Sequence, residues 1–232
     1  MSVTIQQLLY TEHPEQWWAL AEHLGFRAPY EPTPEWGEFH ADGVFAVHRV
    51  TGGHPPGSAD IHVLVDDLAA AASALASFTV EREVMEGVGD VLIVRAASGI
   101  SISVSQGTAP AVSHEISVQP LWFQADLAEP RAILEELGLH AGIASDGGGW
   151  IELQAAAGSV GLHAGEPKIG LSFEARGDLD ALAARLREAG FAASVVDEAF
   201  ARTIRIPDPD GVAEIWINGV QDDLHGYHRI SS

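Results

Sequence analysis

Apolar residues recur at helical spacing in four stretches of the chain. In the clearest stretch, Leu179, Leu182, Ala183 and Leu186 fall at positions i, i+3, i+4 and i+7, which places them on one face of a helix. Gly190 follows where a left-handed residue would end that helix. The same reasoning predicts helices over residues 14–24, 67–76, 126–137 and 178–189.

A short apolar run precedes each predicted helix, and strand-like runs follow it. The leading runs are residues 4–10, 61–65, 117–123 and 169–173, and each unit closes with a glycine turn and one more strand. The order of strand, helix and then about three strands occurs four times, at a period of roughly 50 to 60 residues. This pattern indicates an internal repeat of four βαβββ modules.

The first and third modules also resemble each other locally. The segment WGEF at 36–39 leads to His48, and the segment WIEL at 150–153 leads to His163. The chain therefore looks like two halves, each made of two modules.

The repeat predicts the domain organisation. We expect one domain over residues 1–107, with modules 1–56 and 57–107, and a second over residues 112–232, with modules 112–165 and 166–220 and a tail at 221–232. The intervening segment GTAPA at 107–111 is typical of a linker. We expect the first module to pair with the second and the third with the fourth.

Two segments of the fourth module carry a resemblance to a known family. Residues 171–182, LSFEARGDLDAL, look like the first strand and helix start of a family module, and residues 207–215, PDPDGVAEI, look like its turn into the last strand. On these segments the chain resembles the vicinal-oxygen-chelate family of glyoxalases, bleomycin-resistance proteins and extradiol dioxygenases. The resemblance implies an α+β fold in which four βαβββ modules form two cup-shaped, glyoxalase-like domains, with the helices outside and a binding cup inside each.

Side-chain alternation in the last strand of each module agrees with that architecture. In the fourth module, Ile215 and Ile217 share one face, while Glu214 and Trp216 share the other. The other three last strands separate apolar from small, polar or aromatic positions in the same way. One face therefore suits packing under a helix, and the other suits the lining of a cup.

The resemblance also implies metal ligands near the start of each first strand and in each last strand. The matching positions hold Gln6, Ala46, Asp60 and about Ser103 in the first half, and Gln119, Gly161, Gly170 and Glu214 in the second. Alanine, glycine and serine do not supply the expected ligands, so we expect no functional metal. His163 lies two residues beyond the matching position Gly161, on the same strand face. If a metal binds, we expect Gln119, His163 and Glu214 to hold it, as a divalent iron, manganese, nickel or zinc ion.

The candidates for ligand binding are the polar and aromatic residues expected to face the cups. They are Gln6, Trp36, His48, Asp60, His62, Gln119, Trp150, His163, Glu214 and Trp216. His62 shares a strand face with Asp60, and a carboxylate can orient an imidazole as base or ligand. A structural role stays open for each candidate, because glutamines and histidines also hydrogen-bond within sheets and most tryptophans pack in cores.

Charge and composition narrow the partners and the location. The chain has 12 Lys and Arg against 33 Asp and Glu, a formal net charge of −21, which opposes binding to nucleic acid or to anionic membranes. Cysteine is absent, so thiolate chemistry and disulfides are excluded. The first residues lack a signal-peptide pattern and no apolar run is long enough to span a bilayer, so we expect a cytoplasmic location. We expect the chain to be a monomer or a homodimer.

Three functions remain open from the sequence, and the sequence does not decide whether the chain is an enzyme. The main prediction is a bleomycin-resistance-like protein that binds a small apolar or aromatic molecule in a cup without a metal. The alternative is a metal-dependent lyase, isomerase or dioxygenase of the family. The third is a structural or regulatory protein whose cups have degenerated. In the tail, His225 and His228 belong to a solvated segment or to a small closing flap.

Overall fold

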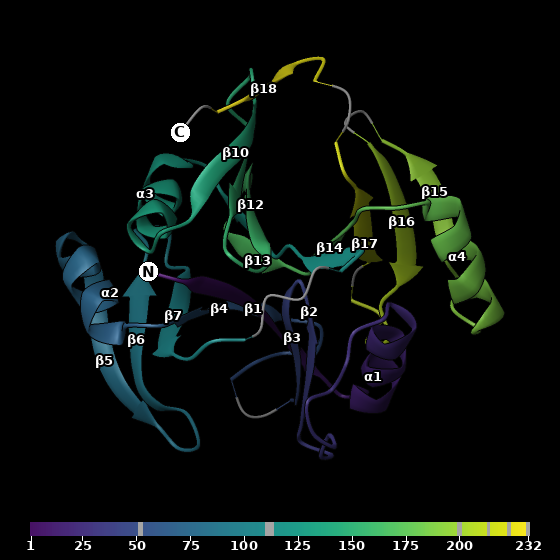
Figure 1. Ribbon diagram of the computed structural model, residues 1–232, viewed down its shortest axis with the longest axis horizontal. Helices are drawn as coiled ribbons and strands as arrows, with labels where there is room; N and C mark the ends of the chain where they lie inside the picture. Colours follow the sequence, from purple (N-terminus) through teal and green to yellow (C-terminus); the bar gives the residue numbers. More distant parts are fainter. Residues whose placement is uncertain (51–52, 110–113, 199–200, 213, 222–223, 231–232) are drawn as a thin grey trace.

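The computed structural model describes residues 1–50, 53–109, 114–198, 201–212, 214–221 and 224–230. All four predicted helices are present, and they lie on the outside of the molecule (Figure 1). They are α1 (Pro14–His23), α2 (Leu68–Ala74), α3 (Ala128–Glu136) and α4 (Leu179–Glu188), and a short 3-10 turn, η1 (Leu75–Ser77), continues α2. The side chains of Asp67 and Asp178 cap α2 and α4 by accepting hydrogen bonds from the first free backbone amides of those helices.

The first two modules share one seven-stranded sheet. Its order is β2-β3-β1-β4-β7-β6-β5, and the first strands β1 and β4 pair antiparallel at its centre. The strands are β1 (Val3–Thr11), β2 (Trp36–Ala41), β3 (Gly43–Arg49), β4 (Ala59–Val65), β5 (Thr79–Met85), β6 (Gly89–Arg95) and β7 (Ser101–Gln106). Among its described residues, the first module has two strands after its helix where about three were predicted, and Arg27 forms only an isolated bridge to His40.

The third and fourth modules pair through first strands that are each broken in two. The predicted strand 117–123 is interrupted at Gln119 and Pro120, and the predicted strand 169–173 is interrupted at Leu171. The pieces are β8 (Ile116–Val118), β9 (Leu121–Gln124), β13 (Lys168–Gly170) and β14 (Ser172–Ala175). β8 pairs with β14 and β9 pairs with β13, so the breaks divide the strands between two sheets. Because proline has no backbone N–H, Pro120 cannot continue a sheet ladder.

The two sheets form the two walls of a cup in the second half (Figure 1). One wall is β13-β9-β12-β11-β10-β18 and the other is β15-β16-β17-β14-β8. The remaining strands are β10 (His140–Ser145), β11 (Trp150–Gln154), β12 (Ser159–Ala164), β15 (Ser194–Asp197), β16 (Arg202–Pro207), β17 (Glu214–Gly219) and β18 (Tyr227–Arg229).

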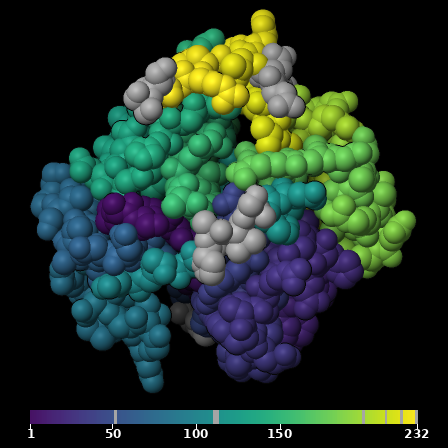
Figure 2. All heavy atoms as spheres, in the orientation of Figure 1, coloured from purple at the N-terminus to yellow at the C-terminus, as the bar shows by residue number. Residues whose placement is uncertain are grey.

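The chain after β17 leaves one wall and pairs with the other. β18 runs antiparallel to β10, with Tyr227 opposite Ser145 and Arg229 opposite Ile143. We call residues 224–230 the strap. Figure 2 shows this C-terminal segment, in yellow, lying across the top of the second half. This pairing agrees with a closing flap, which is one of the two options that the sequence leaves open for the tail.

The apolar core lies between the helices and the outer faces of the sheets. It includes the predicted stripe of α4, and Trp17 and Trp122 are at most 1% exposed. Phe45 and Phe173 meet edge to face at 5.3 Å across the two halves. Backbone hydrogen bonds also join the halves, from Ile5 to Ala157 and from Val118 to Asp42. The halves are therefore packed into one body, which holds the floor of the second cup in place.

The structure bears only in part on the expected linker and on the expected absence of a membrane-spanning segment. Pro110 and Ala111 of the expected linker lie outside the described residues. Among the described residues, we find no helix with the length and apolar character needed to span a bilayer.

Candidate ligand-binding site

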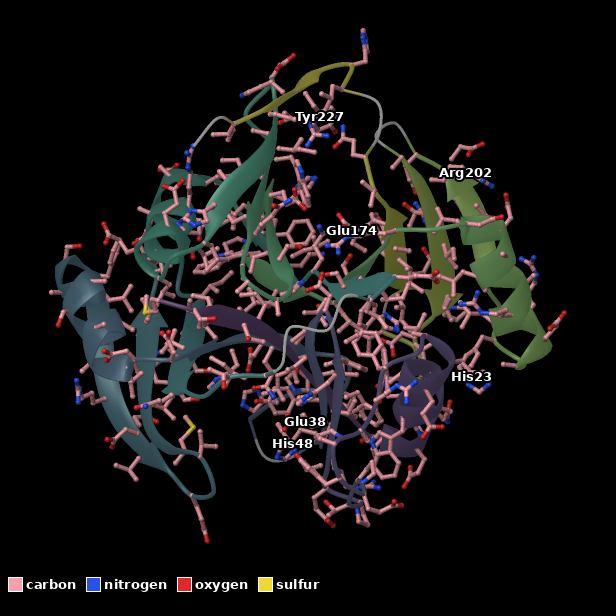
Figure 3. The ribbon with its side chains drawn as sticks, viewed as in Figure 1. His23, Glu38, His48, Glu174, Arg202 and Tyr227 are labelled. Atoms are coloured by element: carbon pink, nitrogen blue, oxygen red, sulfur yellow. The ribbon has the colours of Figure 1, made fainter. Side chains whose placement is uncertain are left out.

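A cavity of about 450 Å³ lies between the two walls of the second half. Gln119 and Glu174 line its closed end, Trp150 and Trp216 line its walls, and Tyr227 of the strap lies at its outer end. Figure 3 shows Glu174 and Tyr227 at these opposite ends. We call this space the second-half cavity.

Aromatic side chains cover one wall of the cavity. Trp150 and Phe123 flank His163, with ring centroids 6.1 Å and 5.1 Å from the imidazole. The neighbouring position on β12 is Gly161, where a Cβ atom would lie 2.3 Å from the ring of Trp150. Only glycine therefore leaves room for the indole to lie flat against the strand and face the cavity.

A chain of polar contacts fixes the closed end. Gln119 donates from Nε2 to Ser159 Oγ at 3.2 Å and lies 3.5 Å from an oxygen of Glu174. The other oxygen of Glu174 lies 3.4 Å from Nε of Arg176, whose guanidinium is 3.0 Å from Asp42 of the first half. Burial, as the largest effect, raises the pKa of Glu174 above its ordinary value, although Arg176 opposes it.

Glu152 is a second buried carboxylate of the cavity. It lies on β11 and is 7% exposed, and Gln154 donates from Nε2 to its Oε2 at 3.2 Å. Burial and the nearby charge of Glu174 raise the pKa of Glu152 to about 6, because Arg176 and Arg229 compensate for them only in part. Glu152 therefore changes its protonation state close to neutral pH.

A series of hydrogen bonds connects a strand of the first half to the wall of the cavity. Gln7, fully buried on β1, accepts a hydrogen bond from the backbone of Ser172 at 3.1 Å. Ser172 Oγ accepts from Asn218, and Asn218 Oδ1 accepts from Thr203, each at 3.0 Å. Because Asn218 lines the cavity, the position of its side chain depends on a residue of the first module.

The strap is held to β10 by several contacts. His228 lies 2.8 Å from a carboxylate oxygen of Asp146, and the backbone amide of Asp146 donates to Gly226. These contacts direct Tyr227 and Arg229 toward the cavity, which both residues line.

In the second half, the structure brings together four of the five sequence candidates. Gln119, Trp150, His163 and Trp216 line the cavity. Glu214 does not line it, and its carboxylate lies 3.3 Å from Arg205 at the exposed start of β17. The proposed metal ligands Gln119, His163 and Glu214 are therefore not assembled around one point.

In the first half, two candidates lie opposite each other on the central strands. Gln6 of β1 is the direct partner of His62 of β4. The imidazole of His62 lies 2.6 Å from Ser103 Oγ and 2.8 Å from Ser105 Oγ, and burial lowers the pKa of His62 to about 4. Its two ring nitrogens are thus engaged within the sheet.

The other first-half candidates surround Tyr10. His48 packs against Tyr10 at 5.6 Å and against Trp36 at 5.7 Å, and His54 stacks on Tyr10 at 3.8 Å. Asp60 lies 3.7 Å from His54, and burial is the main cause that raises the pKa of Asp60. Side chains of this half therefore contact one another on its inner face.

Sequence reasoning missed the most distinctive residues of the cavity. The expected position Gly170 lies on β13, and the break at Leu171 places Glu174 on β14, at the closed end of the cavity. The alternation in 171–175 (LSFEA), with Phe173 buried on the opposite face, was the available signal. Glu152 stands within the repeated segment 150–153, which was noted only as evidence of duplication.

Comparisons with known proteins identify the architecture. No protein-family model matches the sequence, and no curated protein sequence matches it. Solved structures do match: homoprotocatechuate 2,3-dioxygenase from Arthrobacter globiformis aligns with a TM-score of 0.65 at 14% identity, over 99% of this chain and 80% of its own. A catechol 2,3-dioxygenase aligns with a TM-score of 0.65 at 14% identity, over 100% and 97% of the two chains. The fold is that of these extradiol dioxygenases.

A third solved structure supports the same conclusion about the fold. The 2,2',3-trihydroxybiphenyl 1,2-dioxygenase from Sphingomonas wittichii strain RW1 aligns with a TM-score of 0.62 at 14% identity, over 99% of this chain and 91% of its own. All three are extradiol dioxygenases, so the predicted resemblance holds at the level of the fold, and the α+β fold is confirmed. At this identity the likeness concerns the fold, and function depends on the side chains of the site.

The dioxygenases that share this fold are metal-dependent, so the donors of the cavity can be tested against a divalent metal. An extradiol site of the 2-His-1-carboxylate type needs two imidazoles and a carboxylate facing one point. The cavity offers one imidazole, His163, whose Nδ1 lies 2.7 Å from the carbonyl oxygen of Ala164, and it also holds two guanidinium groups. Within the described part of the chain, no group of three or more His, Cys, Asp or Glu is arranged to hold a metal. These residues do not fit such a site.

Proposed function

We propose that the chain binds a small, largely apolar or aromatic molecule in the second-half cavity. The observation that carries this proposal is a cavity of about 450 Å³ with aromatic walls and a few buried polar groups at its closed end. Cavities of roughly 300 to 1,000 Å³ with this mixture of linings are typical of small-molecule sites. Tryptophan faces supply large apolar contact areas for flat ligands, while Gln119, Asn218 and Glu152 supply directional partners.

The proposal includes binding without a metal. Support comes from the donor set, in which the carboxylates of the cavity are accompanied by Arg176 and Arg229 and by a single imidazole. A site of the 2-His-1-carboxylate type needs a second imidazole, which the lining of the cavity does not include. Metal independence is a prediction that a metal-content measurement tests.

A specific observation favours a second candidate, a ring-cleaving dioxygenase. The dioxygenases that match the fold align over nearly the whole of this chain, which supports this alternative more directly than a glyoxalase or bleomycin-resistance activity. This candidate requires a redox metal. The described side chains would have to rearrange to provide its ligands.

Calorimetric titration of the full chain with 1-naphthylmethanol tests the binding proposal. We expect saturable binding of about one molecule per chain, weakened at least roughly tenfold in Trp150→Ala because the variant loses an apolar wall of the cavity. Trp36→Ala changes the matching residue of the first half. If Trp36→Ala abolishes binding and Trp150→Ala does not, the ligand site lies in the first half and the proposal is wrong.

Metal loading separates the two candidates. Untagged protein is exposed in turn to iron, manganese, nickel and zinc, and the retained metal is quantified, followed by oxygen-uptake measurements with catechol under iron. Binding without a metal predicts no stoichiometric ion and no catechol-dependent uptake. A tightly retained ion, about one per chain, together with oxygen uptake, would establish the dioxygenase instead.

A further inference from the structure

Two carboxylates occupy the same place in the duplicated halves. Glu38 and Glu152 are each the third residue of the matching segments 36–39 and 150–153. Each stands opposite a small residue of the next strand, Ala46 in the first half and Gly161 in the second. The two positions therefore allow a comparison within one chain, in which the backbone setting is shared and the side-chain partners differ.

The carboxylate of the first half is fully occupied by its own neighbours. Tyr30 donates from its hydroxyl to one oxygen of Glu38 at 2.9 Å, and His40 donates from Nε2 to the other. The hydrogen bond from His40 is the main cause that lowers the pKa of Glu38. Tyr30 and His40 together therefore provide a hydrogen-bond donor to each oxygen of the Glu38 carboxylate.

The carboxylate of the second half is left with one weak partner. Gln154 stands where His40 stands in the first half, and its neutral amide donates to Oε2 of Glu152. Within the described ranges, no Lys, Arg or His nitrogen lies within 4 Å of Glu152, although the residue is 7% exposed and lines the cavity. A buried carboxylate in this state lacks the charged or strong hydrogen-bonding partner that such groups usually have.

The charged groups that face Glu152 do not neutralise it. They are His163 on β12, Glu174 and Arg176 from β14 and the residue that follows it, and Arg229 on the strap. Arg176 is already paired with Glu174 and with a carboxylate of the first half, and Arg229 is exposed to solvent, where its charge is screened. Burial, followed by the charge of Glu174, raises the pKa of Glu152 more than Gln154 and the two arginines lower it, so a charged donor beside Glu152 would stabilise its ionised form.

Aromatic faces stand beside this carboxylate. Trp150 lies two residues before Glu152 on the same face of β11, and Trp216 lines the cavity from the other wall. Aromatic rings attract organic cations through their negative faces, and the attraction strengthens when water is excluded. The cavity thus combines an unpaired buried anion with the surfaces on which an organic cation is best accommodated.

We propose that the second-half cavity selects ligands that carry a protonated amine on an aromatic or apolar body, with the ammonium at Glu152 and the body between Trp150 and Trp216. This inference rests on the proposed function, since it names the chemical class that the same cavity takes. The ammonium supplies the strong donor that His40 supplies to Glu38 in the first half.

Three probes of one shape test the inference by calorimetry with the full chain at about pH 7.5, where an alkylamine is protonated and a carboxylic acid is ionised. They are 1-naphthylmethylamine, 1-naphthylmethanol and 1-naphthoic acid. We expect the amine to bind about tenfold or more tightly than the alcohol, because a charged hydrogen bond replaces a neutral one. We expect the acid to bind most weakly.

Two matched variants locate the effect. Glu152→Gln keeps the shape of the side chain and removes its charge, so the amine should lose about tenfold in affinity while the alcohol changes little. Glu38→Gln makes the same change at the duplicated position outside the cavity, and all three probes should bind as in the parent. Circular dichroism confirms that both variants are folded.

The pH dependence gives an independent readout. As pH falls through about 6, Glu152 takes up a proton and the advantage of the amine over the alcohol should shrink, whereas Glu152→Gln should show no such change. An alcohol or acid that binds as tightly as the amine, or an amine whose affinity survives Glu152→Gln, overturns the inference and leaves the proposed function standing. Failure of all three probes to bind overturns both.

Discussion

At the scale of single residues, the two halves show how one sequence pattern leads to different chemistry. The pairs Trp36 and His48, and Trp150 and His163, keep nearly the same edge-to-face arrangement. The second aromatic neighbour of each histidine differs: His48 packs on Tyr10, whose ring is stacked by His54, and His163 packs on Phe123. Alternation along strands predicted these inner-face positions, because it is a local property. Which rings are covered depends on distant residues, which alternation cannot reveal.

The charge state of His62 gives a prediction at this scale. Its pKa in the folded chain is about 4, below the ordinary 6.5 that applies to the unfolded chain, so the unfolded state binds more protons between these values. The contribution of His62 to the free energy of unfolding is therefore fully present above about pH 6.5 and is lost progressively as the pH falls toward 4. We expect the parent to lose on the order of 1–2 kcal/mol of unfolding free energy relative to His62→Gln between about pH 7 and pH 5.

Urea denaturation of both proteins at the two pH values measures this difference. Comparison with the variant removes the contribution of the other titrating groups, including Glu152, whose raised pKa acts in the opposite direction. Parallel stability curves for parent and variant would show that His62 is solvated and titrates normally.

At the scale of elements, periodicity predicted the helices and the modules well, and long-range pairing decided the rest. Each helix ends within a few residues of its predicted limits because the apolar stripe is a local signal, as is the glycine that follows α1, α3 and α4. The breaks at Pro120 and Leu171 were missed because they depend on the meeting of two walls. The strand within the strap was not predicted, because a three-residue strand acquires its structure only by pairing with β10.

The strap also leads to a prediction. Tyr227 lines the outer end of the cavity from β18, so Tyr227→Ala should weaken binding of 1-naphthylmethanol about tenfold, mostly through faster dissociation. Stopped-flow fluorescence gives the two rate constants. His228→Ala removes the contact with Asp146 but keeps Tyr227, and it should show a smaller change of the same sign. Unchanged dissociation in both variants would mean that the strap does not cover the ligand.

At the scale of the whole molecule, the halves are joined by aromatic packing and by buried polar bonds. Phe45 of the first half contacts Phe173 of the second, and Gln7 bonds to Ser172. The repeat predicted two halves, but it could not predict that the closed end of one cup is built partly from the other half. That contribution comes from residues such as Asp42, whose turn carries no signal of a distant partner.

This joint core predicts cooperative unfolding. Phe45→Ala leaves a cavity in the shared core and should cost about 3–5 kcal/mol, which lowers hydrogen-exchange protection in β1 and β14 together. Exchange measured by mass spectrometry reports both strands in one experiment, and Tyr30→Ala, at an exposed ring, should leave both unchanged. Loss of protection confined to β1 would show that the halves unfold separately.

The hydrogen-bonded carboxylate of Glu38 in the first half also indicates how ligand binding at Glu152 could be blocked. Glu38 receives its strongest partner from a histidine two residues further along the strand, and Glu152 has Gln154 at that position. A single exchange, Gln154→His, would give the second half an internal cation in place of the one it is proposed to take from solution. The chain thus contains, in its own duplicated copy, the design of a self-inhibited form of its binding site.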